Sequence, residues 1–134
     1  MLVDSHCHLD FEAFSDDLED VLKRAEEAGV SAMQTICTRL SHFEDVIRIA
    51  KRYSNIWCSV GVHPHNVIDE KKFSVEDILH IVNSYREVIG IGETGLDFYY
   101  EHTPKDQQIA AFRVHIQAAR ESGLPIIIHT RDAD

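Results

Sequence analysis

The sequence predicts an α/β domain in which strands and amphipathic helices alternate around one parallel sheet. Near-continuous apolar runs, separated by helical patterns, are typical of parallel strands that helices cover. Candidate strands begin near residues 2, 30, 56, 87 and 124, which is a loose repeat of the size of one βα unit. A TIM-type barrel and a doubly wound sheet both have this repeat, and 134 residues suffice for about five units of a (β/α)8 barrel.

The first two strands are expected at residues 2–7 and 30–37. Between them, apolar residues recur on one face of a helix that should begin at Asp16 and end at Gly29. Aspartate is a preferred N-cap residue, and glycine commonly ends helices because it tolerates left-handed backbone angles. This part of the chain therefore predicts a complete strand–helix–strand unit.

The central part of the chain predicts two further helices that begin at capping boxes. Ser41 with Glu44 is the first pair, and Ser74 with Asp77 is the second. In such a pair, the hydroxyl and the carboxylate satisfy backbone N–H groups of the first helical turn. Apolar residues continue on one face after each pair, and a third strand is expected between the helices, over residues 56–62.

The fourth and fifth strands are expected over residues 87–92 and 124–128. The helix between them should begin with Thr103 at the N-cap and Pro104 at the first position, where the missing N–H of proline has no partner to lose. Gly123 is expected to end this helix.

Composition indicates one globular domain over residues 1–134, with 44% hydrophobic and 27% charged residues. No apolar run approaches the ~18 residues that a membrane helix needs, so no membrane partner is expected. The formal charge of −10 excludes broad electrostatic attraction to nucleic acid, so any polyanion must be bound locally. Cys7, Cys37 and Cys58 form no C-x-x-C motif, which favours reduced thiols and a cytoplasmic location.

Two H-x-H pairs are candidate metal ligands. His6 and His8 lie at the end of the first strand, where alternation sends both imidazoles to the same side. Because α/β barrels build active sites at this end of their strands, we expect the pair to bind one metal ion. Chance is the alternative explanation, since nine histidines also produce the pair His63 and His65. His63 ends the third strand, and we expect it to contact substrate rather than metal.

Glu93 lies among three glycines, Gly90, Gly92 and Gly95, whose spacing matches the dinucleotide-binding fingerprint. A Rossmann loop leads directly into a helix, whereas here a carboxylate occupies the loop and the next helix begins several residues later. We therefore expect the glycines to let the strand end turn tightly while Glu93 projects over the barrel mouth, where it could bridge two cations. Asp97 is expected nearby, to support the ligands or contact the substrate.

His129 and Arg131 follow the fifth strand. A buried core histidine is the alternative for His129. However, His129 lies at the third strand end in the chain to carry a metal-type side chain, so we expect it to be a ligand. Arg131 lies within reach of the same mouth, and its guanidinium suits bidentate contact with a phosphate. An exposed loop charge is the alternative for Arg131.

Four motifs that carry these residues occur in order along the chain. They are Val3-Asp4-Ser5-His6-Cys7-His8-Leu9-Asp10, Gly61-Val62-His63-Pro64, Gly92-Glu93-Thr94-Gly95-Leu96-Asp97 and His129-Thr130-Arg131-Asp132-Ala133. Together they resemble the TatD family of metal-dependent deoxyribonucleases. The resemblance implies that the chain is the N-terminal half of a TIM-type barrel, with the C-terminal half absent.

The resemblance also implies a site and an activity. It implies His6 and His8 on one divalent cation, Glu93 bridging to a second, and His129 on the second, with magnesium, manganese or zinc as the metal. A further histidine and an aspartate would come from later strands that this chain lacks. The complete protein is therefore expected to hydrolyse DNA phosphodiester bonds, and this chain alone is expected to be inactive.

Two other functions remain open at this point. The same kind of metal-ligand set serves C–N and ester hydrolysis in the amidohydrolase superfamily, so that class is the alternative enzyme. The non-enzymatic alternative is a half-barrel without catalytic activity whose open surfaces self-associate.

Overall fold

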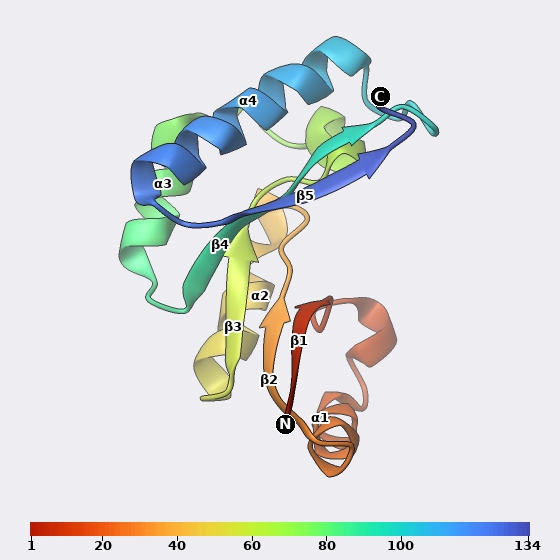
Figure 1. The fold of residues 1–134 in the computed structure, drawn as a ribbon, viewed down its shortest axis with the longest axis vertical. Coiled ribbons are helices and arrows are strands. Elements are labelled where there is room, and N and C mark those ends of the chain that lie inside the picture. The colour runs from red at the N-terminus through yellow and green to blue at the C-terminus, as the bar shows by residue number, and fades with distance from the viewer.

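A computed structural model describes residues 1–134 as five parallel strands in the order β1-β2-β3-β4-β5, alternating with helices (Figure 1). The strands are β1 (Leu2–Cys7), β2 (Val30–Thr35), β3 (Ile56–Val60), β4 (Val88–Asp97) and β5 (Ile126–Arg131). The α-helices are α1 (Leu18–Glu27), α2 (Phe43–Arg52), α3 (Val75–Ser84) and α4 (Lys105–Ser122). Three short 3-10 helices complete the fold: η1 (Glu12–Phe14), η2 (Leu40–His42) and η3 (Pro64–Asp69).

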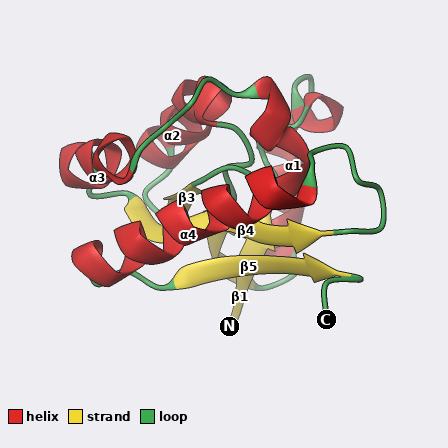
Figure 2. Ribbon diagram, turned by 90° about the horizontal axis from the view of Figure 1, so that it is seen from above, coloured by secondary structure: helices red, strands yellow, loops and turns green.

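The strand order identifies the fold as half of a TIM-type barrel. Each new strand is added beside the previous one, whereas a doubly wound sheet reverses its strand order at a switch point. The helices are grouped on one face of the sheet (Figure 2). None of these helices combines the length and the apolar character that crossing a membrane requires.

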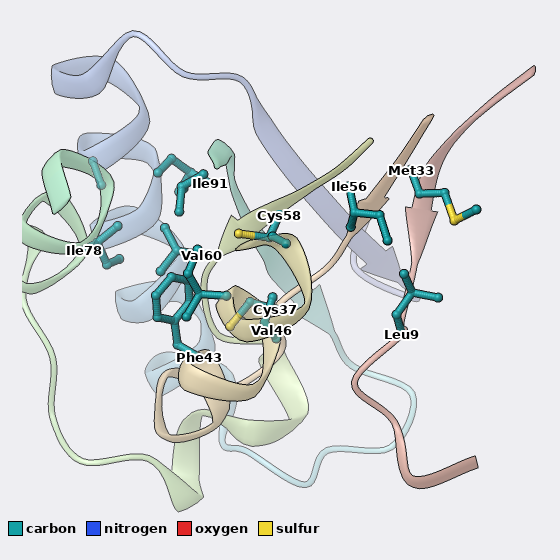
Figure 3. Close-up of a cluster of buried hydrophobic side chains, with 14 residues drawn as sticks. Leu9, Met33, Cys37, Phe43, Val46, Ile56, Cys58, Val60, Ile78 and Ile91 are labelled. Atoms are coloured by element: carbon teal, nitrogen blue, oxygen red, sulfur yellow. The ribbon is translucent and has the colours of Figure 1, made fainter. Parts of the chain in front are cut away.

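The hydrophobic core lies between the sheet and the helices (Figure 3). Helix α2 supplies four buried residues at helical spacing: Phe43, Val46, Ile47 and Ala50. Fully burying a side chain of this kind stabilises the fold by roughly 1.5–3 kcal/mol. All three cysteines are free thiols, as expected from their spacing, and burial raises the pKa of Cys37 to about 12.

One of the two expected capping boxes is present. Ser74 and Asp77 form the reciprocal pair at the start of α3, which confirms that prediction. The prediction for Ser41 and Glu44 is wrong, because α2 begins at Phe43 after η2 and has no side-chain cap. Ser41 instead donates its N–H and its hydroxyl to the carboxylate of Glu70, so a tertiary contact replaces the local one.

Helix α4 ends as predicted but begins differently. Gly123 is the C-cap and has a φ of 72°, in the left-handed region that glycine favours. At the other end, Pro104 rather than Thr103 is the N-cap, so the helix begins one position later than predicted. Thr103 is fully buried, and its hydroxyl donates to the carbonyl of His65. The threonine therefore joins the start of α4 to η3.

Strand β4 extends five residues beyond the predicted end at residue 92. It continues through Gly92 and Gly95 beside β5, with an irregular register between Ile91 and Thr94. The expected tight turn at these glycines is therefore wrong. Gly95 serves close strand approach instead, because its φ is 140° and an added Cβ would lie 2.0 Å from the carbonyl oxygen of His129.

Candidate metal centre

Glu93 in β4 brings two groups of histidines together at the carboxyl end of the sheet. His6 and His8 come from the end of β1, and form one group with Glu93. His63, which follows β3, and His129 in β5 form the other group with the same carboxylate. Within each group the candidate ligand atoms lie within 4.8 Å of one another. The four predicted metal ligands are thus neighbours in space.

The first group has the spacing of ligands around one ion. Nε2 of His6 lies 3.4 Å from Glu93 Oε2, and Nε2 of His8 lies 3.8 Å from the same oxygen. Two donors that share a tetrahedral ion at about 2.0–2.1 Å lie roughly 3.3 Å apart. His8 Nδ1 lies 3.2 Å from the carbonyl of Ile36, which favours a proton on Nδ1 and a free lone pair on Nε2. These donors therefore fit a divalent cation.

The second group faces the other carboxylate oxygen. Nδ1 of His129 lies 3.4 Å from Glu93 Oε1. Glu93 is only 8% exposed, and its charge is paired with imidazoles alone. A buried carboxylate needs a compensating cation, and imidazole nitrogen with carboxylate oxygen is a donor set that suits borderline divalent metals. The geometry of Glu93 is that of a carboxylate able to bridge two ions.

His63 differs from His8 and His129 because its engaged ring nitrogen, Nδ1, accepts a hydrogen bond rather than donating one. This atom accepts the backbone N–H of His65 at 3.1 Å. Burial, together with the neighbouring His129 and His65, lowers the pKa of His63 to about 3, so the ring is neutral. Its proton then lies on Nε2, which makes His63 a hydrogen-bond donor toward the mouth. This state favours substrate contact over metal ligation, although His63 lies beside His129 with ring centroids 4.4 Å apart.

Asp97 is fully buried and both of its carboxylate oxygens are engaged. Oδ2 lies 2.9 Å from His129 Nε2 and 2.8 Å from His65 Nε2. Oδ1 accepts the backbone N–H groups of Tyr99 and Tyr100 at 3.1 and 3.4 Å. Burial raises the pKa of Asp97, but the hydrogen bonds outweigh burial and hold that pKa at about 2. Asp97 therefore orients other groups, and direct substrate contact, one of its two expected roles, does not fit its burial.

The contact between Asp97 and His129 has a chemical consequence for the site. A carboxylate that accepts from Nε2 keeps the proton on that nitrogen and leaves the Nδ1 lone pair free. Nδ1 is the atom that faces Glu93. The aspartate thus selects the tautomer of His129 that could bind a metal.

Three supporting residues have no clear signal in the sequence. Gln108 on α4 is fully buried, and its amide binds both backbone groups of Asp97 at 2.8 and 2.9 Å. His65 follows the predicted His63 by two positions, and only its H-x-H spacing could have indicated it. His115, also buried on α4, accepts the N–H of Val62 at 3.0 Å and so fixes the segment that leads to His63.

Burial lowers the pKa of His115 to about 4, so its ring is neutral in the folded protein. Nδ1 is 2.7 Å from the carbonyl of Ala111, to which it donates, and this leaves Nε2 as the acceptor for Val62. Helix α4 therefore supports the site at two points: Gln108 holds the backbone of Asp97 in β4, and His115 holds Val62 after β3.

Arg131 is the last residue of β5 and pairs in register with Asp97 of β4. Its guanidinium lies over the rings of Tyr99 and Tyr100. No carboxylate of the chain forms an ion pair with it. Arg131 thus lies two positions after the candidate ligand His129, on the same strand and opposite Asp97.

Comparison with protein families gives an independent line of evidence. The family model described as TatD related DNase matches residues 3–134. YcfH of Escherichia coli (strain K12), an uncharacterized metal-dependent hydrolase, is 39% identical over 98% of this chain. The 3'-5' ssDNA/RNA exonuclease TatD of Salmonella typhimurium (strain LT2) is 37% identical over 90% of this chain.

Solved structures agree with the sequence comparison. The crystal structure of YJJV, a TatD homolog from Escherichia coli K12, matches with a TM-score of 0.90 and 30% identity. The match covers 98% of this chain and 51% of that one. The chain likewise spans about half the length of the curated relatives it matches, 50% for YcfH and 46% for the Salmonella exonuclease.

Proposed function

The chain belongs to the TatD family of metal-dependent hydrolases, and from this premise we propose that the complete protein hydrolyses phosphodiester bonds of DNA with two divalent cations. The observation that carries the proposal is the position of Glu93, whose two oxygens face two different histidine groups. A carboxylate shared in this way is typical of two-metal hydrolases. A relative with an exonuclease name supports a nucleic-acid substrate.

The distances between these side chains support two proposed ligand sets. His6, His8 and Glu93 Oε2 would hold one cation, and Glu93 Oε1 with His129 would hold the second. Magnesium, manganese and zinc are the metals we consider. When bound, two such cations supply charge neutralisation for the phosphoryl group and raise the acidity of an attacking water. The further histidine and aspartate implied by the family resemblance would complete the set in the full-length protein.

The chain's own side chains would bind and orient the substrate. His63 would donate a hydrogen bond from Nε2–H to a phosphate oxygen, because its Nδ1 is occupied and its ring is neutral. Arg131 would contact a phosphate through two N–H groups. These local donors reconcile a polyanionic substrate with a chain whose formal charge is −10.

The proposal is tested by DNA digestion with the complete protein. We expect cleavage of a single-stranded oligonucleotide only when divalent cations are added, and complete loss after chelation. Cleavage that continues at the same rate in rigorously metal-free protein would refute the two-metal proposal. Hydrolysis of cyclic amides or esters without any cleavage of DNA would favour the amidohydrolase alternative.

A pair of histidine variants makes this test specific. His129→Ala removes a proposed ligand, whereas His80→Ala removes an exposed histidine on α3 outside the cluster. We expect His129→Ala to lower both the bound metal, measured by elemental analysis, and the cleavage rate. His80→Ala should change neither. Equal metal content in the two variants would remove His129 from the ligand set.

A further inference from the structure

The loop between β4 and α4 exposes two large aromatic rings beside the candidate metal centre. Tyr99 is 56% exposed and Tyr100 is 51% exposed. Their rings are perpendicular, with centroids 4.7 Å apart. The loop lies next to the end of β5, close to the C-terminal end of the chain (Figure 1). Two adjacent exposed rings offer a flat apolar surface to a ligand.

Arg131 lies against both rings. Its Cζ is 4.2 Å from the centroid of Tyr99 and 4.7 Å from the centroid of Tyr100. A guanidinium over an aromatic face is held by a cation–π interaction while its N–H groups remain available at the edge. Neither a hydrogen bond nor an ion pair within the chain uses those groups. The cluster therefore combines a stacking surface with an unpaired positive charge.

Backbone hydrogen bonds hold this cluster next to the metal ligands. Asp97 Oδ1 accepts the N–H groups of Tyr99 and Tyr100, and its other oxygen contacts His129. The N–H of Phe98 donates to the carbonyl of Arg131 at 3.0 Å, which ties the start of the loop to β5. One buried carboxylate thus fixes the position of the aromatic loop relative to a proposed ligand.

We propose that Tyr99, Tyr100 and Arg131 form a binding site for one nucleotide of a single-stranded nucleic acid, next to the bond that is cleaved. A base stacks on the exposed ring of Tyr99, because the Tyr100 ring already stacks on His102 with centroids 5.8 Å apart, and Arg131 binds the adjacent phosphate. The base must be free of a duplex, because paired bases are already stacked and cannot reach a side chain. This inference rests on the proposed function, since the scissile phosphate at the metal centre sets the position of the strand.

The experiment measures binding separately from cleavage. Labelled oligothymidylate, and an abasic strand of the same length, are titrated with the complete protein in chelator, and binding is followed by fluorescence anisotropy. We expect the wild type to prefer oligothymidylate. Tyr99→Ala should weaken oligothymidylate binding on the order of tenfold and abasic binding much less, because the Tyr100 ring still holds the Arg131 guanidinium. Tyr99→Phe, which keeps the ring, should bind like the wild type.

Arginine variants test the phosphate contact. Arg131→Gln should weaken binding of both strands, because both have phosphates. Arg86→Gln is the matched control, since Arg86 is exposed and precedes β4 at the opposite end of the strand. It should bind both strands like the wild type. Circular dichroism and thermal melting of each variant confirm that it is folded.

The outcomes separate this inference from the proposed function. Equal binding of both strands by the wild type, or equal losses for both strands in Tyr99→Ala, would overturn the stacking site. A base-dependent loss in Tyr99→Ala by a protein that shows no metal-dependent cleavage would support the stacking site and refute the nuclease proposal. Cleavage of DNA by Tyr99→Ala with unchanged binding of oligothymidylate would refute the stacking site and support the nuclease proposal.

Discussion

Asp97 connects more parts of the site than any other side chain. Through one oxygen it orients His129 and His65, and through the other it fixes the Tyr99–Tyr100 loop. Its own backbone is held by Gln108, so the carboxylate cannot shift without breaking contacts to α4. The charge of Asp97 therefore contributes both to folding and to the geometry of the proposed ligands. The contribution to folding can be isolated by changing the pH, because it requires the ionised carboxylate.

Asp97→Asn keeps the shape of the side chain and removes its charge. The pKa of Asp97 is lowered from 3.8 to about 2 in the folded protein, so its ionised form stabilises the fold. That stabilisation, roughly 2 kcal/mol, is complete above about pH 4 and is lost as the pH falls through about 2. We therefore expect wild type and variant to differ in unfolding free energy at neutral pH and to converge in acid.

Urea unfolding of both proteins, down to the lowest pH at which both fold, measures this difference. A constant difference from pH 7 to pH 3 and below would show that the carboxylate charge does not stabilise the fold. We also expect the variant to bind metal about 10–100-fold more weakly, because His129 loses the partner that sets its tautomer.

Glu93→Gln, unlike Asp97→Asn, should affect cleavage far more than stability. The carboxylate faces His6, His8 and His129 and accepts no backbone hydrogen bond, so its loss removes a proposed bridging ligand with little change in packing. We expect the complete protein to lose nearly all metal-dependent cleavage and the melting temperature to change by less than about 4 °C. A large fall in melting temperature with preserved turnover would make Glu93 a structural residue.

The residues at strand ends were predictable from the sequence, and so was the supporting role of Asp97, but Gln108 and His115 were not. His6, Glu93 and His129 could be placed at one edge because parallel strands end on the same side of a sheet. Gln108 carries no such mark, since a glutamine in the first turns of an amphipathic helix usually faces solvent. Its contact with Asp97 depends on how α4 packs on β4, which local sequence patterns do not contain.

At the scale of elements, β4 differs most from its prediction. The apolar run ends at Gly92, which indicated a strand end, yet β4 extends to Asp97 because β5 pairs with it residue by residue beyond that point. Gly95 pairs directly with His129 in this stretch. Pairing of this kind is a property of two strands together. The position of His129 therefore depends on a glycine 34 positions earlier in the chain.

Gly95→Ala tests this dependence. An added Cβ would lie 2.0 Å from the carbonyl oxygen of His129, and the φ of 140° is strained for alanine. We expect a loss of unfolding free energy of more than about 3 kcal/mol, or failure to fold. Gly29→Ala is the matched control, because Gly29 also has a positive φ, 89°, but an added Cβ would meet nothing within 4 Å.

The control variant should lose only about 1–2 kcal/mol, the cost of a left-handed backbone for a residue with a side chain. Thermal or urea unfolding of the two variants gives the comparison. Similar losses in both would show that backbone conformation, rather than contact between β4 and β5, explains the requirement for glycine at residue 95.

At the scale of the whole molecule, the sheet has two open edges. β1 and β5 are the outermost strands, and each therefore presents backbone groups on one side without a strand partner. The relatives, of which this chain spans about half, have the additional length that could cover these edges. Exposed apolar residues on the two edge strands include Leu2, Val3 and Ile128.

The 134-residue chain by itself should therefore self-associate, because unpaired strand edges and exposed apolar side chains can be buried against a second copy. Sedimentation velocity should show dimers or larger species. Introducing charge on both edges with Val3→Lys and Ile128→Lys, at side chains that are 66% and 54% exposed, should shift the chain toward monomer. Ile68→Lys is the matched control, since Ile68 is 50% exposed but lies in η3 away from either edge. A chain that sediments as a monomer and cleaves DNA at the rate of the complete protein would refute the open-edge argument, because such a half-barrel would need neither its missing neighbours nor the ligands proposed to come with them.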